Sequence, residues 1–300
     1  MLFMKKHLAL GFLAFLLGNV SIYKAQRNEI GVRLGVNNLV GDIGNTNYFI
    51  QRPFASVKGS GVPVSVGGFY RFNFNPQQSL RLDVGYNRIK FYDELTQEEY
   101  RRNRGTWGNN NAFEASLLFE YNFLGINNEQ RYGMLSPYIF AGFGAMMHNI
   151  SQVKLFHDFT RDADGVALAP THEEDFVTSY TFNKTQKITP FIPFGIGVKY
   201  KFNYNWTVSV EAMLRPTFSD QLDYSHLRAE DIRSEYSQDI ITPSTNASLL
   251  QVPEYYNISL QREKEFLKNR QIGETKGKDW VNSVTIGLSY SFGRPPCYCD

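Results

Sequence analysis

The stretch Trp280–Phe292, WVNSVTIGLSYSF, decides the fold of this chain. Its side chains alternate in character: Ile286 and Leu288 fall on an apolar face, while Thr285 and Ser289 fall on a small, polar one. A period of two predicts a strand at the boundary between an apolar and a polar environment. In a soluble sandwich the apolar face would point inward, whereas in an outer-membrane barrel it points outward to lipid.

The same alternation recurs along the chain, and we expect about eight strands of the roughly 9 to 11 residues that cross a bilayer at a tilt. Ordinary soluble strands are shorter, about 5 or 6 residues. The run from Tyr138 to Met147 is apolar and glycine-rich on both sides, so the sequence assigns it no inward face. The expected strands begin near Ile30, Val64, Leu80, Phe113, Tyr138, Ile192, Trp206 and Trp280.

The connections alternate strictly between long and short, which places all long loops at one end of the barrel and all tight turns at the other. Aromatic residues such as Tyr290 and Phe292 stand at the strand ends beside the short connections, as in the girdle of a membrane interface. A soluble lipocalin-like barrel is the competing interpretation, but it would bury apolar side chains and expose charges. The long connections are 37–61, 92–111, 149–187 and 217–279, and the short ones are 75–79, 125–137 and 203–205.

We therefore predict an all-β fold: an eight-stranded antiparallel transmembrane outer-membrane β-barrel over residues 26–292, with long extracellular loops, short periplasmic turns and both termini periplasmic. Residues 1–25 have the basic start and apolar core of a secretory signal peptide, with Ala25 before the expected cleavage point. An uncleaved anchor is the alternative, although the apolar run is short for a membrane span. The 31 basic and 29 acidic residues are too balanced to suggest nucleic acid as a partner.

Charged residues recur on the face opposite the apolar one, so we expect them to line the lumen. A barrel of eight strands leaves no room for a wide channel, and side chains of opposite charge are expected to fill it and pair. A narrow ion pathway is the alternative. The expected lumen network comprises Arg33, Arg71, Arg81, Asp83, Glu114, Glu120, Lys199, Lys201, Glu211 and Arg215.

No motif predicts catalysis, a cofactor or a metal. His148, His157, His172 and His226 fall in or near long loops without a spacing that selects a nucleophile, a base and an orienting acid. Asp162, Asp164 and Gly165 resemble the start of a calcium loop but lack its remaining ligands, so a solvated acidic loop is favoured. We expect no enzyme activity.

The last connection is too long to be structureless in a compact protein. Residues 227–236 and 259–267 have helix-compatible composition, and Ser225 could cap the first of these helices. A folded extracellular cap over the barrel mouth is therefore expected.

The tail, residues 293–300, cannot extend the last strand, because Pro295 and Pro296 remove backbone donors. We expect it to project into the periplasm. Cys297 and Cys299 could bridge each other, bond a partner or stay reduced in that oxidising space.

Three motifs carry a family resemblance. They are Glu29-Ile30-Gly31-Val32 leading to Gly41-Asp42-Ile43-Gly44; Glu211 and Arg215 followed by Thr217-Phe218-Ser219-Asp220; and Ser291-Phe292-Gly293-Arg294-Pro295-Pro296-Cys297. Together they resemble the PorG family, the outer-membrane barrels of the type IX secretion system of Bacteroidetes, over essentially the whole mature chain.

The resemblance implies a component that joins the outer membrane to the periplasmic ring of the PorK lipoprotein and PorN. That machine exports proteins with a C-terminal signal domain and, in species with gliding motility, adhesins. The expected contacts to the ring lie in the tail, at Arg294, Pro295, Pro296, Cys297, Tyr298 and Cys299. The alternative function is a stand-alone surface barrel, similar to OmpA or OmpW, whose loops bind ligands or host surfaces.

Overall fold

The structure is a computed structural model that describes residues 28–44, 62–94, 96–126, 133–159, 163, 176–203, 205–236, 253–270 and 277–293. The expected signal peptide and the tail from Arg294 onward lie outside these residues. The helices are α2 (Glu99–Arg104), the 3-10 helix η2 (Ala229–Asp231) and α3 (Pro253–Arg270). The strands are β1 (Asn28–Val40), β2 (Val64–Asn73), β3 (Gln78–Tyr92), β4 (Trp107–Asn122), β5 (Met134–Phe159), β6 (Phe176–Phe191), β7 (Phe194–Lys201), β8 (Trp206–Leu214), β9 (Ile232–Tyr236) and β10 (Trp280–Phe292).

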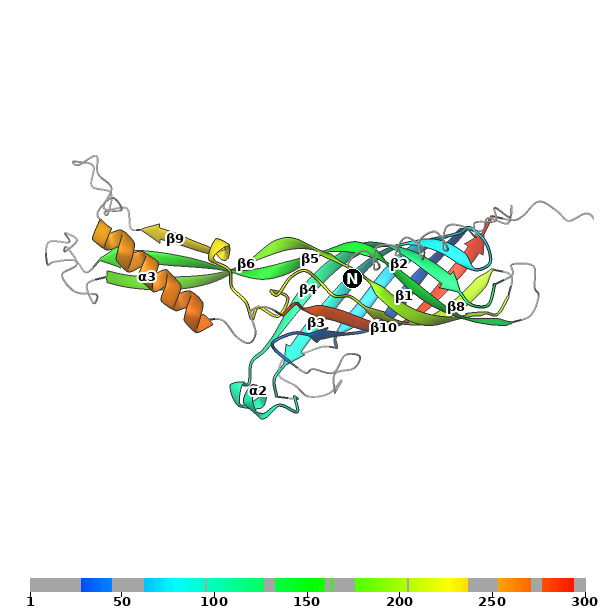
Figure 1. Ribbon diagram of the computed structural model, residues 1–300, viewed down its shortest axis with the longest axis horizontal. Helices are drawn as coiled ribbons and strands as arrows, with labels where there is room; N and C mark the ends of the chain where they lie inside the picture. The colour runs from blue at the N-terminus through cyan, green and yellow to red at the C-terminus, as the bar shows by residue number, and fades with distance from the viewer. Residues whose placement is uncertain are drawn as a thin grey trace, which may run out of the picture.

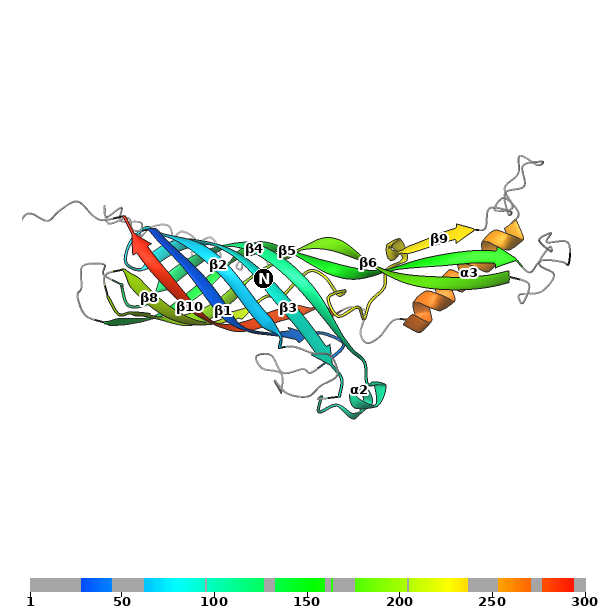
Figure 2. The ribbon, with the colours of Figure 1, turned by 180° about the vertical axis from the view of Figure 1, so that it is seen from behind.

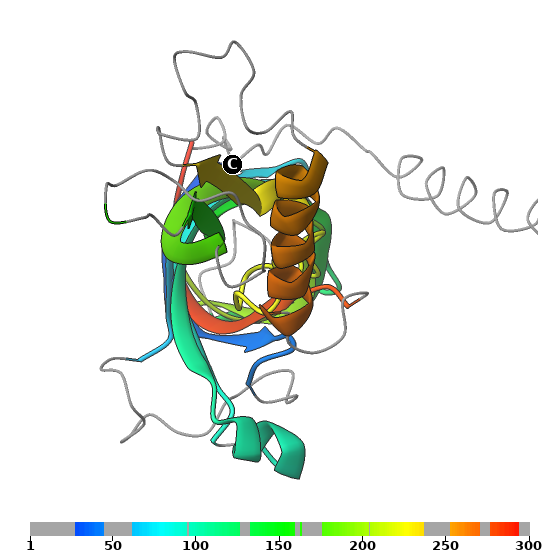
Figure 3. The same ribbon diagram turned by 90° about the vertical axis from the view of Figure 1, so that its left-hand side faces the viewer.

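Eight of these strands close into a barrel. The order β4-β3-β2-β1-β10-β8-β7-β5 is antiparallel throughout, and pairing of β4 with β5 completes the ring. The opening stretch, β10, lies between β1 and β8, so the first and last strands of the barrel seal against each other. Figure 3 shows the barrel in a view along its long axis, from the end at which α3 lies. The prediction of an eight-stranded antiparallel barrel is confirmed.

The barrel is apolar outside and polar inside. Val32, Leu34 and Ile286 are 64%, 61% and 61% exposed, while charged residues of the opposite faces are almost fully buried. This inverts the arrangement of a soluble barrel, and it is favourable only when the surroundings of the barrel wall are lipid. The chain is therefore a transmembrane barrel of the outer-membrane type.

One end of the barrel is closed by tight turns. Asn75 Oδ1 accepts hydrogen bonds from the backbone N–H groups of Gln77 and Gln78, at 2.9 and 2.8 Å. Asn203 Oδ1 does the same for Asn205 and Trp206. An asparagine that bonds its own turn in this way makes a two- to four-residue connection stable without further packing. Exposed aromatic pairs surround this end, such as Trp206 with Tyr290 at 5.1 Å between ring centroids, as the girdle requires.

At the other end, two strands leave the barrel. β5 has 26 residues, and its final part pairs with β6 on one side and, in parallel, with β9 on the other. The strand therefore runs for roughly 80 Å, more than twice the span of a bilayer core. This hairpin with β9 and α3 forms an arm that projects away from the barrel (Figure 1, and from behind in Figure 2).

The arm has its own small core. Val153 and Leu155 of β5 pack with Leu227 and Ile232, and α3 covers them with Phe266 and its neighbour. Tyr180 and Phe182 of β6 stack against Phe266, with ring centroids 5.4 and 6.2 Å apart. The arm is thus a folded unit held by apolar packing.

The structure corrects the predicted loops. Residues 149–187 are mostly strand, because beyond the membrane neither face of β5 or β6 need be apolar and the alternation that reveals a strand disappears. Residues 227–236 form the short 3-10 helix η2 and the strand β9 and not one continuous helix, since Ile232 packs in the arm core by pairing beside Val153. The predicted helix at 259–267 is confirmed within α3. In the other loops, β1 continues to Val40 and residues 92–111 contain α2 and the start of β4.

Neither α2 nor α3, within the described part of the chain, combines the length and the apolar character of a membrane-spanning helix.

Candidate functional site

All ten residues of the expected lumen network are buried inside the barrel, each less than a tenth exposed. Nine of them form ion pairs with one another, and Lys201 is likewise buried, on the inward face of β7. All ten residues therefore lie in the interior of the barrel. The alternating pattern left one strand unassigned, and the structure shows that the inward residues of β5 include Tyr138 and Phe140.

Near the turn end of the lumen, Glu120 is the hub. Its carboxylate accepts from Arg71 Nε at 2.8 Å, and Lys199 Nζ lies 2.5 Å from the same oxygen. Arg71 also donates a hydrogen bond to Glu29 at 2.6 Å. Glu29 belongs to one of the three motifs described above but was not among the expected lumen residues. Glu29 could have been found from its place on β1, four residues before Arg33 and on the same face.

In the middle of the lumen, Arg81 connects strands from opposite sides of the wall. It donates to both oxygens of Glu211, at 2.6 and 3.1 Å, and lies 2.9 Å from Glu120. The Tyr138 hydroxyl donates to the same Glu211 carboxylate at 2.5 Å. A bidentate pair with a third donor satisfies a buried carboxylate, which would otherwise carry a large desolvation cost.

Toward the loop end, Arg33 bridges two acids. Its Nη2 lies 2.7 Å from both Asp83 and Glu114, and Arg215 donates to the same Glu114 oxygen at 3.1 Å. Arg81 Nε lies 3.5 Å from Asp83 and so links this group to the rest. The described lumen is therefore filled by a continuous chain of alternating charges.

Aromatic rings occupy the space that the charges leave. Phe69 is 5% exposed and lies beneath the guanidinium groups of Arg71 and Arg81, 4.8 and 5.4 Å from its centroid. Gly31 makes room for the ring, because a Cβ there would lie 2.4 Å from the Phe69 Cζ atom. Guanidinium groups over aromatic faces gain a further attraction in a desolvated site.

A second polar group lies at the loop end, where three segments meet. Asp223 accepts from the backbone of Ile43 and Ser225, each at 2.9 Å, and Asp279 accepts from the backbone of Leu222 at 2.9 Å. Gly41 faces both acids: a Cβ there would lie 2.5 Å from one and 2.8 Å from the other. We call Asp220, Asp223 and Asp279 the rim carboxylates. They tie the end of β1 to the residues before β9 and β10.

Burial raises the pKa of all three rim carboxylates. For Asp279 the Asp223 charge adds to the effect of burial, and its pKa lies well above the ordinary value. Burial also raises the pKa of Asp223, although the hydrogen bonds from its backbone donors act in the opposite direction. Burial and the charges of Asp42 and Asp223 raise the pKa of Asp220 to about 6. The group therefore holds protons under conditions in which exposed carboxylates have lost them.

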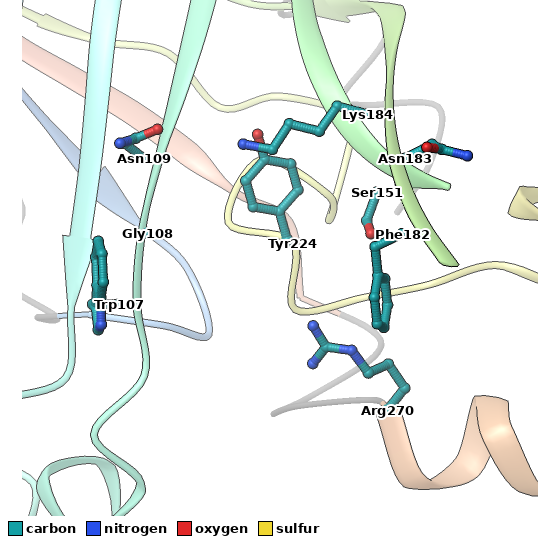
Figure 4. A pocket seen from close by; sticks show the side chains of 9 residues that line it. All are labelled: Trp107, Gly108, Asn109, Ser151, Phe182, Asn183, Lys184, Tyr224 and Arg270. Atoms are coloured by element: carbon teal, nitrogen blue, oxygen red, sulfur yellow. The ribbon is translucent and has the colours of Figure 1, made fainter. Parts of the chain in front are cut away.

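An open cavity of about 360 Å³ lies where the arm leaves the barrel (Figure 4). Trp107 of β4 and Phe182 of β6 stand at its sides, and Tyr224 forms part of its wall. Lys184 lies over the Tyr224 ring at 5.0 Å, and the Arg270 guanidinium over Phe182 at 5.3 Å. We call this the arm-base cavity. No local sequence pattern indicates this cavity, because its lining combines residues from five segments of the chain.

Two of the histidines noted in the sequence lie on β5. His148 and His157 lie at different heights of β5 and contact Thr189 and Thr178 hydroxyls, at 2.9 and 3.0 Å. Burial lowers the pKa of His157 to about 4. In the part of the chain that the structure describes, no cluster of His, Cys, Asp and Glu has the arrangement of a metal site. The predicted acidic loop from Asp162, apart from Ala163, lies outside that part, as do His172 and the tail residues Arg294–Cys299.

Solved structures with similar topology are bacterial outer-membrane proteins. The N-terminal β-barrel domain of Pseudomonas aeruginosa OprF is 13% identical, with 89% of this chain and 97% of that chain covered and a TM-score of 0.34. Pseudomonas aeruginosa OprG is 10% identical, with 90% and 96% covered and a TM-score of 0.35. Yersinia pestis Ail, in a complex with a heparin analogue, is 10% identical, with 89% and 99% covered and a TM-score of 0.35.

No curated protein matches the sequence. One family model does, under the description "Domain of unknown function (DUF6089)", and it covers residues 7–171, from before the first barrel strand to beyond β5. That is more than half of the 300 residues. The chain, a transmembrane β-barrel with a charge-filled lumen and a projecting arm, therefore belongs to the DUF6089 family.

Proposed function

We propose that this protein is a non-catalytic outer-membrane component of the type IX secretion system, which anchors the periplasmic ring of the PorK lipoprotein and PorN to the outer membrane. The observation that carries the proposal is the filled lumen. Charged side chains from both sides of the wall pair in its centre, at distances such as 2.6 Å between Arg81 and Glu211. A barrel without an open path suits an anchor better than a channel.

The two ends of the barrel support the same role. The turn end is compact, with asparagine-stabilised turns directly beside the aromatic girdle. A partner in the periplasm would contact such an end through the turns and through the tail that follows Phe292. In this orientation both termini are periplasmic, and the arm lies outside the cell.

The resemblance to the PorG family supplies the identity of the partner. Its motifs include Glu29, Glu211 and Arg215, which all lie in the lumen network, and Gly41 with Asp220, which lie at the rim. Motif residues that lie in the lumen network stabilise the barrel and are not accessible to a partner. We therefore assign recognition of the ring to the third motif, in the tail after Ser291.

Deletion of residues 294–300 tests the anchor. The full-length and shortened proteins are purified in a gentle detergent with their partners, which are identified by mass spectrometry. We expect the deletion to reduce recovery of the PorK lipoprotein and PorN at least tenfold and to lower export of proteins with a C-terminal signal domain, while the barrel still reaches the outer membrane. Heat-modifiable mobility on a gel, a property of intact barrels, serves as the folding control.

Two further variants make the result specific. Replacement of the arm's β5–β6 hairpin by a short turn, joining residue 150 to residue 185, leaves the turn end intact and should retain ring recovery. Unchanged recovery from the tail deletion would remove the tail from the interface. Absence of ring proteins from the full-length preparation would contradict the proposed function itself.

The alternative, a surface barrel that binds ligands through its loops, has one observation in its favour: the arm is folded, with a core of its own. It predicts the opposite pattern. Removal of the arm would then abolish the phenotype of the protein, and removal of the tail would leave it unchanged.

A further inference from the structure

The arm-base cavity has the chemistry of a ligand site, and this inference does not depend on a role in secretion. Its lining comes from the start of β4, the outer parts of β5 and β6, the segment before η2 and the end of α3. A volume of about 360 Å³ lies in the range of small-molecule sites. The cavity is open on one side, so a ligand can enter without any rearrangement of the arm.

The charge of the lining is positive. Lys184 and Arg270 contribute cations, and none of the described residues that line the cavity is acidic. Neither cation forms an ion pair with a carboxylate of the described residues; each lies instead over an aromatic ring, Tyr224 or Phe182. Such a contact holds the side chain in place but leaves its N–H donors available, so an anion can bind without breaking an existing salt bridge.

The remaining lining is aromatic and amide. Trp107 and Phe182 are 48% and 45% exposed, which is high for large rings on a folded surface. Asn109, Asn183 and Ser151 add short donors and acceptors, and no aliphatic side chain belongs to the lining within the part of the chain that the structure describes. Flat aromatic rings can pack against the C–H faces of a sugar, and side-chain amides can exchange hydrogen bonds with its hydroxyl groups. A groove for a peptide would instead offer aliphatic pockets or a free strand edge.

We propose that the arm-base cavity binds an acidic saccharide, with Lys184 and Arg270 on its carboxylate or phosphate and an exposed ring, Trp107 or Phe182, against its sugar face. The ligand can come from two sources: a soluble acidic glycan, or the acidic sugars of lipopolysaccharide in the same membrane. Both present the same group to the cavity, and the experiment separates them.

Binding is measured on the full-length barrel in detergent micelles with three probes of similar size: an oligogalacturonate hexamer, a neutral maltohexaose and a hexaglutamate peptide. Purified lipopolysaccharide is the fourth probe, for the membrane source. We expect the oligogalacturonate, the lipopolysaccharide or both to bind, with affinity that falls as salt rises. The neutral sugar and the peptide should bind at least tenfold more weakly.

The decisive variant is Lys184→Gln with Arg270→Gln, which removes both cations and should weaken binding at least tenfold. Its matched control is Lys264→Gln with Lys268→Gln, which removes the same charge from exposed positions on α3 outside the cavity and should change affinity less than twofold. Trp107→Leu should weaken binding of the saccharide without changing the salt dependence of its affinity. Heat-modifiable mobility confirms that each variant is folded.

Three outcomes overturn the proposal. Equal loss in the α3 control would assign the effect to net charge and not to the cavity. Binding of hexaglutamate as tight as that of oligogalacturonate would assign the cavity to an acidic polypeptide. Absence of binding by both acidic saccharides would leave the cavity without this ligand class.

Discussion

Arg81 of β3 and Glu211 of β8 meet across the barrel lumen in a bidentate pair, with N–O distances of 2.6 and 3.1 Å, although 130 positions separate them in the sequence. Both side chains are nearly inaccessible to solvent. Two strands that share no backbone hydrogen bond are thus joined through the centre of the barrel.

Breaking this pair should destabilise the barrel. Loss of one partner leaves an uncompensated buried charge, at a cost of about 3–5 kcal/mol, whereas replacement of both by apolar residues of similar volume is close to neutral. We expect Glu211→Met to lower the urea midpoint for unfolding in micelles, and Arg81→Met with Glu211→Met to recover much of it. The exposed pair of Lys154 and Glu235 on the arm is the control, since Glu235→Gln should cost less than about 1 kcal/mol. Equal effects at both sites would contradict the interior role.

The filled lumen predicts an electrically silent barrel. In planar bilayers the protein should show conductance near background, because Arg81 and Glu211 fill the middle of the lumen and Glu120 pairs with Arg81 on the turn side. A variant with serine at all three positions removes most of that volume and should show discrete openings. Stable openings of the unaltered protein would instead establish the narrow ion pathway.

Packing around Phe69 is tested by two glycines. A Cβ at Gly31 would lie 2.4 Å from Phe69 and 2.8 Å from a backbone oxygen, whereas at Gly68 the nearest atom is 3.6 Å away. Overpacking typically costs about 1–3 kcal/mol, so Gly31→Ala should lower the unfolding midpoint and Gly68→Ala should change it little. Addition of Phe69→Leu to Gly31→Ala should restore part of the loss.

The rim carboxylates predict a dependence on pH. A carboxyl group whose pKa is raised on folding binds more protons in the folded state, so its contribution to stability is lost as the pH rises from the unfolded value toward the folded one. For Asp220 this window extends from about 4 to about 6, and for Asp279 it reaches higher. Amide hydrogen exchange at Leu222, which donates to Asp279, should therefore become faster at high pH beyond the intrinsic rate.

Asp279→Asn removes this dependence, because the amide oxygen can still accept from Leu222 without a charge to bury. We expect the variant to protect the Leu222 amide more than the unaltered protein at pH 8 and equally at pH 4. The lumen variant Glu211→Met serves as the control and should not alter the pH profile at the rim. A profile unchanged by Asp279→Asn would exclude this carboxyl as its source.

The attachment of α3 to the arm rests on Phe266, which contacts Tyr180 and Phe182. Phe266→Ala should release the helix and make it a substrate for limited proteolysis, with the barrel fragment left intact. Lys264→Ala, two positions earlier and exposed, should leave the digestion pattern unchanged. Loss of the barrel band as well would mean that the arm and the barrel unfold together.

Sequence alone predicted the barrel because lipid on one side and charge on the other impose an alternation with a period of two on every spanning strand, as in β10. The same rule led to the expectation that the charged residues of these strands face the lumen, where the structure buries them. It failed for residues 149–187, since β5 and β6 in the arm have water on much of their surface and carry residues such as Lys154 and Thr181 where a membrane strand would be apolar.

The rim carboxylates and the arm-base cavity were beyond sequence reasoning for another reason. Asp223 and Asp279 are separated by a long connection, and nothing local marks them as neighbours. Their proximity follows from the closure of β10 against β1, which brings the residue before Trp280 beside the residue after Val40. The proximity of Asp223 and Asp279 therefore becomes visible only once the register between β1 and β10 is known.

The length of β5 has a mechanical consequence. One uninterrupted strand belongs both to the barrel wall and to the arm, and its hydrogen bonds pass from β4 and β7 to β6 and β9 without a hinge between them. A load applied to the arm is therefore carried by a ladder of backbone bonds into the wall and not absorbed by a linker. The direction of the arm is therefore set by the tilt of β5 in the barrel wall.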